Sequence, residues 1–195
     1  MKDYKGFTGQ DISYGDALQY YKAANKYSSN SEFIRKAQQL NKLEYEEYLK
    51  KTEFVYSKIS YEEAKRMGDL LDELVRVAPK YDDDFIYRGI GNARQYFESA
   101  NIGDIIDMRG VSSFSSEQRV AFQFQNMNKV NPNDTVQFVV RNGADHSSSI
   151  RHMATYKGEN EVLVSSLQKF RIVQMKTRLH DQVGEYLEIV IESIK

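Results

Sequence analysis

Apolar residues in the N-terminal part of the chain recur every three or four positions, which is the spacing of an amphipathic helix. One such stretch covers residues 16–27, and a longer one follows Ser31 and extends through Leu49. Residues 60–63 read Ser-Tyr-Glu-Glu, a capping box that satisfies unpaired amides at a helix start. Pro79 ends the helix that opens there. The pattern therefore predicts a helical N-terminal region.

After residue 80 the pattern changes to short runs rich in β-branched and aromatic residues, separated by polar turns. A loop rich in Ser, His and Arg is expected between Asn142 and Gly158. Helices followed by strands, with few helices between the strands, favour an α+β fold over a doubly wound parallel sheet. The predicted strands cover residues 85–88, 104–107, 111–115, 135–141, 161–165, 170–174 and 186–191, with short helices near 93–99 and after Ser116.

The chain has 195 residues, and domains typically contain roughly 100–200. We therefore expect one domain, in which residues 1–80 form a helical lobe and residues 81–195 form a β-rich core.

Composition narrows the possible functions. The chain contains no cysteine, which excludes disulfides, thiolate metal sites and a cysteine nucleophile. Its formal net charge of −1 gives no general attraction to nucleic acid or to an anionic membrane. No stretch approaches the roughly 18 apolar residues of a spanning helix, and residues 1–10 do not resemble a secretory signal. We expect a soluble, cytoplasmic protein without a membrane partner. The histidines are scattered without metal-ligand spacing: His146, His152 and His180.

Three short polar motifs lie beside predicted strands: residues 87–89 (Tyr-Arg-Gly), 112–115 (Ser-Ser-Phe-Ser) and 158–161 (Gly-Glu-Asn-Glu). In extended backbone, residues two apart project from the same face, so Glu159 and Glu161 are expected to point together. Paired carboxylates serve reactions at an anomeric carbon, where the transition state resembles an oxocarbenium ion. One carboxylate can stabilise the developing cation while the other orients the nucleophile.

The other two motifs offer groups that could complete such a site. The planar fork of Arg88 suits a phosphate or a carboxylate, and Gly89 would let a ligand approach the backbone closely. Ser113 could hold a carboxylate in one rotamer, whereas helix capping is the simpler expectation for Ser115 and Ser116. Together the motifs could bind a pyrophosphate and stabilise a sugar cation.

In this order, the motifs resemble those of the mono-ADP-ribosyltransferases that carry an arginine, a Ser-x-Ser and a Glu-x-Glu motif. This group includes bacterial toxins, phage-encoded enzymes and vertebrate ectoenzymes. The resemblance covers residues 84–191 and is clearest in residues 112–116 and 159–164. It implies an α+β ADP-ribosyltransferase fold with two packed, mostly antiparallel sheets around an NAD cleft, which the N-terminal helices flank.

The resemblance also implies a reaction: ADP-ribose is transferred from NAD to an arginine of a host or target protein, nicotinamide is released, and no metal takes part. Ser113 would position Glu161, which would bond the ribose 2′-hydroxyl, and Glu159 would face the acceptor arginine. Tyr156 would join Glu159 in target recognition. The implied catalytic residues are Arg88, Ser113, Glu159 and Glu161, and the implied NAD-binding residues are Arg88, Gly89, Ser113, Phe114, Ser115 and Glu161.

Alternatives stay open. Phe114 stands where the family more often has threonine, so the serine pair could instead be Ser112 and Ser113. The same NAD site could serve hydrolysis, or transfer to nucleic acid. A different class of function is a non-catalytic interaction domain, for example part of a phage particle.

Overall fold

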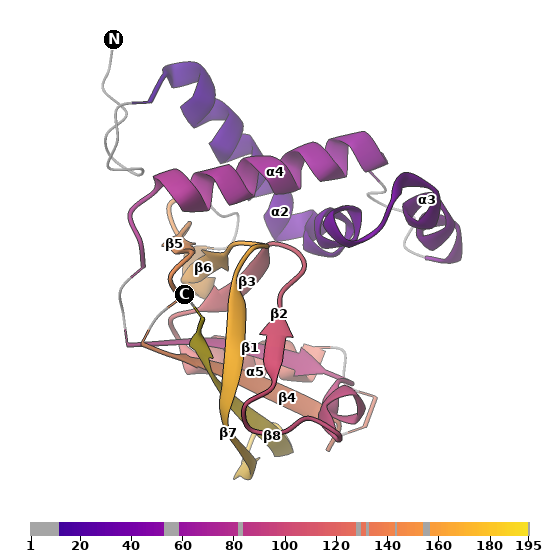
Figure 1. Ribbon diagram of the computed structural model, residues 1–195, viewed down its shortest axis with the longest axis vertical. Helices are drawn as coiled ribbons and strands as arrows, with labels where there is room; N and C mark the ends of the chain where they lie inside the picture. Colours follow the sequence, from indigo (N-terminus) through magenta and orange to yellow (C-terminus); the bar gives the residue numbers. More distant parts are fainter. Residues whose placement is uncertain are drawn as a thin grey trace.

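The computed structural model describes residues 12–52, 59–81, 84–127, 130–131, 133–142, 144–153 and 157–194. Three helices, α2 (Tyr14–Gln39), α3 (Lys42–Lys51) and α4 (Tyr61–Val77), precede the strands along the chain. They lie together at one end of the molecule, and the hairpin of β7 (Lys169–His180) and β8 (Gly184–Ser193) points to the other (Figure 1). One half of the expected capping box of α4 is present, because Ser60 accepts from the Glu63 amide, and the helix ends just before Pro79 as expected.

The helix boundaries before residue 52 differ from the expected ones. Within α2, Asn30 is not helical (φ −136°, ψ 22°), so the expected break just before Ser31 is present as a kink between two helical segments. A second break, which was not expected, follows because Asn41 and Glu44 form a reciprocal capping box that starts α3. The expectation of one helix from Ser31 through Leu49 was therefore wrong. The apolar stripe continues across the break, so hydrophobic spacing alone did not reveal it.

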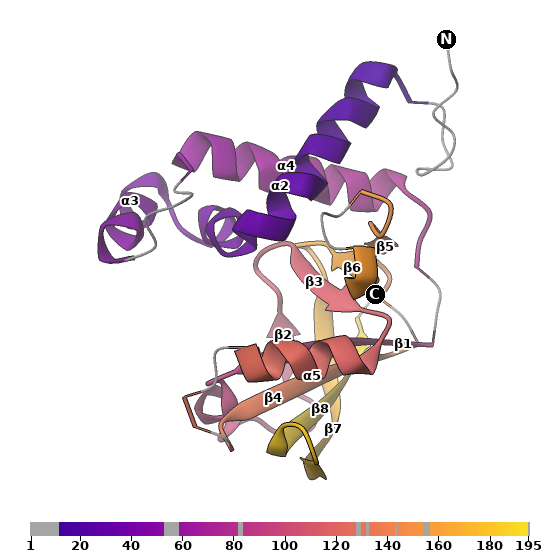
Figure 2. The same cartoon turned by 180° about the vertical axis from the view of Figure 1, so that it is seen from behind.

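The strands form an eight-stranded mixed sheet in the order β2-β7-β8-β4-β1-β3-β6-β5. The pairs are antiparallel except β4 with β8. Helix α5 (Gln118–Met127) lies across β1 and β4 (Figure 2). The expected α+β class is confirmed. The strands are β1 (Phe85–Gly91), β2 (Ile105–Asp107), β3 (Ser112–Ser115), β4 (Thr135–Arg141), β5 (Ser147–Ser149), β6 (Glu161–Val164), β7 (Lys169–His180) and β8 (Gly184–Ser193); the 3-10 turns are η1 (Arg94–Phe97) and η2 (Lys157–Glu159).

The two expected sheets are joined edge to edge by hydrogen bonds. The joint lies between β1 and β3, where Tyr87 pairs with Ser115. On either side the pairing is longer: β1 follows β4 from Phe85 to Gly91, and β3 follows β6 along its whole length. The joint matters for function because it brings the arginine motif on β1 beside the serine motif on β3.

Two features of the sheet were not predicted. Strand β5 consists of three serines, and nothing in that composition favours a strand. Strand β7 extends to His180, far beyond residue 174, because it pairs with β8 along the whole hairpin, although its residues 176–179 are exposed. Backbone pairing, which leaves little trace in the side chains, defines both segments.

Two apolar cores support this arrangement. One is formed mainly by side chains of the strands, among them Ile86, Phe138 and Ile191. The other lies under the helices and combines their apolar faces with residues from the β-rich part. Within the described ranges, no helix combines the length and apolar character that crossing a membrane requires. The buried residues contributed to the helical core by the β-rich part are Val111, Ile150, Met153 and Leu163.

Candidate active site

A cavity of about 620 Å³ opens where α2, β1, β3, α5 and the η2–β6 segment meet. Seven of the eight predicted site residues line it. Tyr156, the eighth, lies outside the described residues. The predicted residues in the lining are Arg88, Gly89, Ser113, Phe114, Ser115, Glu159 and Glu161.

Arg88 links the first two motifs across the β1–β3 joint. Its Nη1 donates a hydrogen bond to the Ser113 carbonyl at 2.6 Å, and its guanidinium lies 5.8 Å from the centre of the Phe114 ring. Burial and the nearby Arg35 cation lower the pKa of Arg88 to about 10. The guanidinium therefore stays charged at neutral pH. This geometry fixes a cation at the wall of the cavity.

Gly89 also lines the cavity, but a different contact explains the glycine. A Cβ at this position would lie 1.8 Å from the Ala121 carbonyl oxygen and 2.8 Å from Cγ of Gln125. Glycine is therefore required for α5 to pack against β1. The expected reason, close approach of a ligand, is not needed to account for this residue.

Glu161 is the first residue of β6, and only 4% of its surface is exposed. Burial raises the pKa of its carboxyl to about 7, and the charge of Glu159 adds to the increase. A hydrogen bond with the Ser113 side chain and the charge of Arg88 act in the opposite direction. The Ser113 hydroxyl is thus placed as its predicted role requires, while the role itself stays a prediction.

The serine register has a structural answer. Ser112 is fully buried and donates to the Gly110 carbonyl at 3.0 Å, and it is not part of the cavity lining. Ser113 and Ser115 both line the cavity. The placement therefore favours the Ser113–Ser115 pair over Ser112–Ser113.

The two glutamates do not share a strand, contrary to expectation. Glu159 ends the η2 turn, Asn160 adopts a left-handed conformation (φ 46°), and β6 begins only at Glu161. Both carboxylates still reach the cavity, because this turn brings them together instead of a strand's two-residue repeat. Burial also raises the pKa of Glu159.

Side chains that follow β3 hold this turn in place. Ser115 donates from Oγ to the Glu159 carbonyl at 2.6 Å and accepts from the Glu117 amide at 3.0 Å. Asn160 donates from Nδ2 to the Glu117 carboxylate. Ser115 thus accepts from an amide just ahead of α5 and not from an amide of the helix itself, and the same hydroxyl also anchors the backbone of the glutamate turn.

Sequence patterns did not point to the helical walls of the cavity. Tyr27, Ser28 and Ser31 contribute from α2, close to its kink. Arg35 lies one turn further along, and its charge affects Arg88 and Tyr27. Its buried Nε has no hydrogen-bond partner among the described residues. In the sequence, the feature that could have indicated this wall is the pair of small polar residues, Ser28 and Ser31, beside the apolar stripe of the helix. Helix α5 supplies Val120, Ala121, Phe124 and Met127.

The side chains that line the cavity suit an anionic ligand that undergoes a reaction at one of its atoms. Arg88 lines the cavity, and the neighbouring charge of Arg35 adds to a positive region that a pyrophosphate would neutralise. Two carboxylates, one of them deeply buried, also line the cavity and could stabilise a developing positive charge. Among the residues that the structure describes, no group of three or more His, Asp or Glu side chains is arranged to hold a metal ion.

Neither a protein-family model nor a curated protein sequence matches this chain. Solved structures do. The Vis toxin, an ADP-ribosyltransferase from Vibrio splendidus, matches with a TM-score of 0.70 and 19% identity over 98% of this chain and 78% of its own. Vis in complex with agmatine matches with a TM-score of 0.69 and 19% identity over 94% of this chain and 76% of that one.

A further match is Plx2a, an ADP-ribosyltransferase toxin from Paenibacillus larvae, with a TM-score of 0.62 and 16% identity over 100% of this chain and 92% of that one. These likenesses show that the chain has the ADP-ribosyltransferase fold, and the expected fold is confirmed.

Proposed function

We propose that this protein is a mono-ADP-ribosyltransferase that transfers ADP-ribose from NAD to an arginine of a target protein and releases nicotinamide. The single observation that carries the proposal is the convergence of Arg88, Ser113 and Glu161 in one cavity, with Glu159 beside them. The ADP-ribosyltransferase fold supports the general reaction, and the toxin neighbours support a target in another cell.

NAD fits the cavity in size and in charge. Ligand pockets usually enclose about 300–1,000 Å³, and this one measures about 620 Å³. The pyrophosphate would lie against Arg88, and the nearby charge of Arg35 would add to its attraction. The apolar wall of α5, which includes Phe124 and Met127, would cover the flat rings.

The buried carboxylate would drive bond cleavage. The bond between the ribose anomeric carbon and the nicotinamide nitrogen breaks, and its electron pair leaves with nicotinamide. Glu161 in its ionised form would accept a hydrogen bond from a ribose hydroxyl and stabilise the oxocarbenium-like transition state. Ser113 would keep that carboxylate in place through the hydrogen bond between them.

Glu159 would determine the acceptor. A guanidinium attacks poorly while it is protonated, so a nearby carboxylate that takes its proton makes a nitrogen lone pair available. The attacking nitrogen forms a bond to the anomeric carbon, and its proton passes to Glu159. The neighbouring Vis structure contains agmatine, which carries a guanidinium group, and this supports an arginine side chain as the acceptor.

Labelled NAD tests the proposal. The full chain is incubated with NAD labelled in its adenylate part and with agmatine or a bacterial lysate, and both transferred label and free nicotinamide are measured. We expect Glu161→Gln to abolish both signals. We expect Glu159→Gln to abolish transfer to agmatine while nicotinamide release into water continues.

The outcomes separate the alternatives. Nicotinamide release without any transfer would replace the proposal with NAD hydrolysis, and label in nuclease-sensitive material would indicate a nucleic acid acceptor. If the parent and Glu161→Gln release nicotinamide equally, the proposed catalytic site is wrong. If calorimetry also detects no NAD binding, a non-catalytic interaction domain becomes the better explanation.

A further inference from the structure

Helix α2 holds the peptide groups that lead into β3. The Val111 amide donates to Oε1 of Gln38 at 2.8 Å, and the Val111 carbonyl accepts from the Tyr27 hydroxyl at 2.9 Å. Val111 is fully buried, so these contacts replace water that its peptide groups lack. Ser113, which contacts both Arg88 and Glu161, lies only two residues further along.

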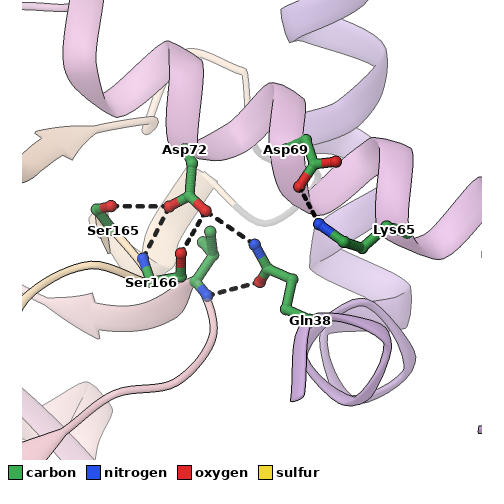
Figure 3. Close-up of polar contacts among 7 residues, drawn as sticks. Gln38, Lys65, Asp69, Asp72, Ser165 and Ser166 are labelled. Atoms are coloured by element: carbon green, nitrogen blue, oxygen red, sulfur yellow. Dashed lines mark hydrogen bonds and ion pairs between the residues drawn. The ribbon is translucent and has the colours of Figure 1, made fainter. Parts of the chain in front are cut away.

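A carboxylate on α4 fixes Gln38 in turn. Nε2 of Gln38 donates to Oδ2 of Asp72 at 2.9 Å (Figure 3). Asp72 also accepts from the Ser165 hydroxyl at 2.8 Å, from the Ser166 amide at 2.7 Å and from the Ser166 hydroxyl. Both serines belong to the turn between β6 and β7. One carboxylate thus connects both long helices with the strand that Glu161 begins.

Close backbone packing supports this connection. A Cβ at Gly68 of α4 would lie 2.6 Å from Cδ of Gln38, so α4 crosses α2 directly against this side chain. A Cβ at Gly110 would lie 3.3 Å from the Arg35 carbonyl oxygen, which places the residues just before β3 in close contact with α2. Gln38 therefore has little space in which to adopt another rotamer.

We infer that Asp72 and Gln38 form a positioning pair that sets the place of Ser113, and through Ser113 the orientation of the Glu161 carboxyl. The inference rests on the proposed function for the part that concerns catalysis. Neither side chain lines the cavity, so both act through Val111 and Ser113 and not on a substrate.

The direction of the hydrogen bonds explains why this pair is specific. Asp72 is an acceptor only, so it forces the amide of Gln38 to present nitrogen to it and oxygen to Val111. In the Asp72→Asn variant, the asparagine Nδ2 would point a donor at the Gln38 Nε2, which is also a donor. If the Gln38 amide rotated to avoid this, its nitrogen would face the Val111 amide, and again two donors would meet. Gln38→Glu alone would place two carboxylates against each other.

The double variant Gln38→Glu/Asp72→Asn restores the pattern with exchanged groups. The glutamate carboxylate accepts from both the asparagine Nδ2 and the Val111 amide, and the asparagine oxygen still accepts from the Ser165 hydroxyl and the Ser166 amide. The Ser166 hydroxyl, which donates to Oδ2 of Asp72, would instead accept from the second hydrogen of the asparagine Nδ2. A matched control is Asp69→Asn, on the same helix. Asp69 pairs with Lys65 at 2.6 Å on the exposed side of α4 and does not touch Gln38 (Figure 3).

Two readouts test the inference at a temperature where every variant is folded. The first is the titration of the Glu161 carboxyl by carbon NMR, which needs no activity. The charged or polar groups that influence this carboxyl are Arg88 on β1, Ser113 on β3, Glu159 in η2 and Tyr27 on α2. The second readout is kcat and KM for nicotinamide release, since misplacing a catalytic group by about 1 Å can cost about 100-fold.

We expect each single variant to move the Glu161 titration to higher pH, because the Ser113 hydrogen bond that lowers this pKa is weakened. We also expect kcat to fall by about tenfold or more with a smaller change in KM. The double variant should recover both values, and Asp69→Asn should match the parent.

Unchanged Glu161 titration in both single variants would overturn the inference, as would a double variant that stays as impaired as the singles. If the parent releases no nicotinamide, the proposed function fails, and the NMR titration still decides the positioning pair.

Discussion

Glu161 illustrates how burial sets the properties of a single side chain. A carboxylate with 4% exposure loses most of its hydration, and the carboxyl resists ionisation until about pH 7. The same environment strengthens its interaction with a developing cation, because competing water is excluded. Under the proposed function, the catalytic strength of Glu161 and its cost in folding stability would therefore have one origin.

This origin makes Glu161→Gln informative about stability as well as activity. The carboxyl has a higher pKa in the folded chain than in the unfolded chain, so the folded state binds more protons and loses stability as pH rises from about 4.5 to about 7. At pH 8 we expect the free energy of unfolding of the neutral glutamine variant to exceed that of the parent by about 1–3 kcal/mol. The difference should vanish below pH 4.5.

Urea titrations at pH 4 and pH 8 measure this difference. In parallel, kcat/KM of the parent for nicotinamide release should rise with pH through about 7, because the ionised carboxylate is the active form. A variant that is less stable than the parent at pH 8 would show that Glu161 is stabilised by its partners and not strained by burial.

For single residues, the sequence predicted which side chains lie together but not how they are arranged. Arg88, Ser113 and Glu161 were expected to act together, and they line one cavity. The expected arrangement of Glu159 and Glu161 along one strand was wrong, because Asn160 takes a left-handed conformation that spacing does not encode. Asparagine adopts this conformation more readily than most residues, so its presence between the glutamates was the available signal.

At the scale of elements, helix α5 and strand β1 pack so closely that one glycine decides the fit. The Ala121 carbonyl occupies the space that a Cβ of Gly89 would need. Arg88 precedes this glycine and Phe124 lies on the same helix, so the contact sets the width of the cavity between two of its walls.

Gly89→Ala should therefore destabilise the protein strongly. The new methyl group would have to push α5 away from β1, because the atom it meets belongs to the backbone. We expect a loss of about 3 kcal/mol or more, which corresponds to a fall in Tm of about 6–12 °C for a chain of this size. Thermal unfolding followed by circular dichroism measures it.

Gly158→Ala is the matched control, because no atom lies within 4 Å of the Cβ that it adds and its backbone is not in the left-handed region. Its Tm should stay within a few degrees of the parent value. Equal Tm values for the two variants would mean that α5 can shift at little cost, and that Gly89 is not required for packing.

The helices also show where prediction by pattern ends. Ser60 and Pro79 marked the limits of α4 correctly, because caps are local signals. The break between α2 and α3 was missed although Asn41 and Glu44 form an equally local capping box. The apolar stripe extended across them and was given more weight than the cap. At this point the capping residues indicate the helix boundary better than the hydrophobic periodicity does.

At the scale of the whole molecule, the sequence predicted the α+β fold and the side-by-side motifs, but it did not predict how the helices complete the site. Tyr27, Arg35 and Gln38 all act on the motif strands from α2, and their partners lie dozens of residues away. Contacts at this sequence separation have no periodic signature. They depend on how a helix lies against a sheet, which only the folded structure reveals.

We expect the boundary at residue 80 to separate two parts of one folding unit, and this leads to a last prediction. The β-rich part buries Val111, Ile150, Met153 and Leu163 against the helices. Burying a large apolar side chain contributes about 1.5–3 kcal/mol, and whole domains are stable by only about 5–15 kcal/mol. Exposing these four side chains together would remove most of that margin.

A fragment of residues 81–195 should therefore lack a cooperative unfolding transition and give poorly dispersed amide NMR signals. Adding a separate fragment of residues 1–80 should restore both, because the lost contacts are not covalent. A single change from Leu163 to Ala in the full chain is the graded control, and it should cost about 2–5 kcal/mol without abolishing the transition. A fragment of residues 81–195 that unfolds cooperatively on its own would show that the helices are an appendage, and it would also weaken the inference that α2 and α4 position the catalytic strand.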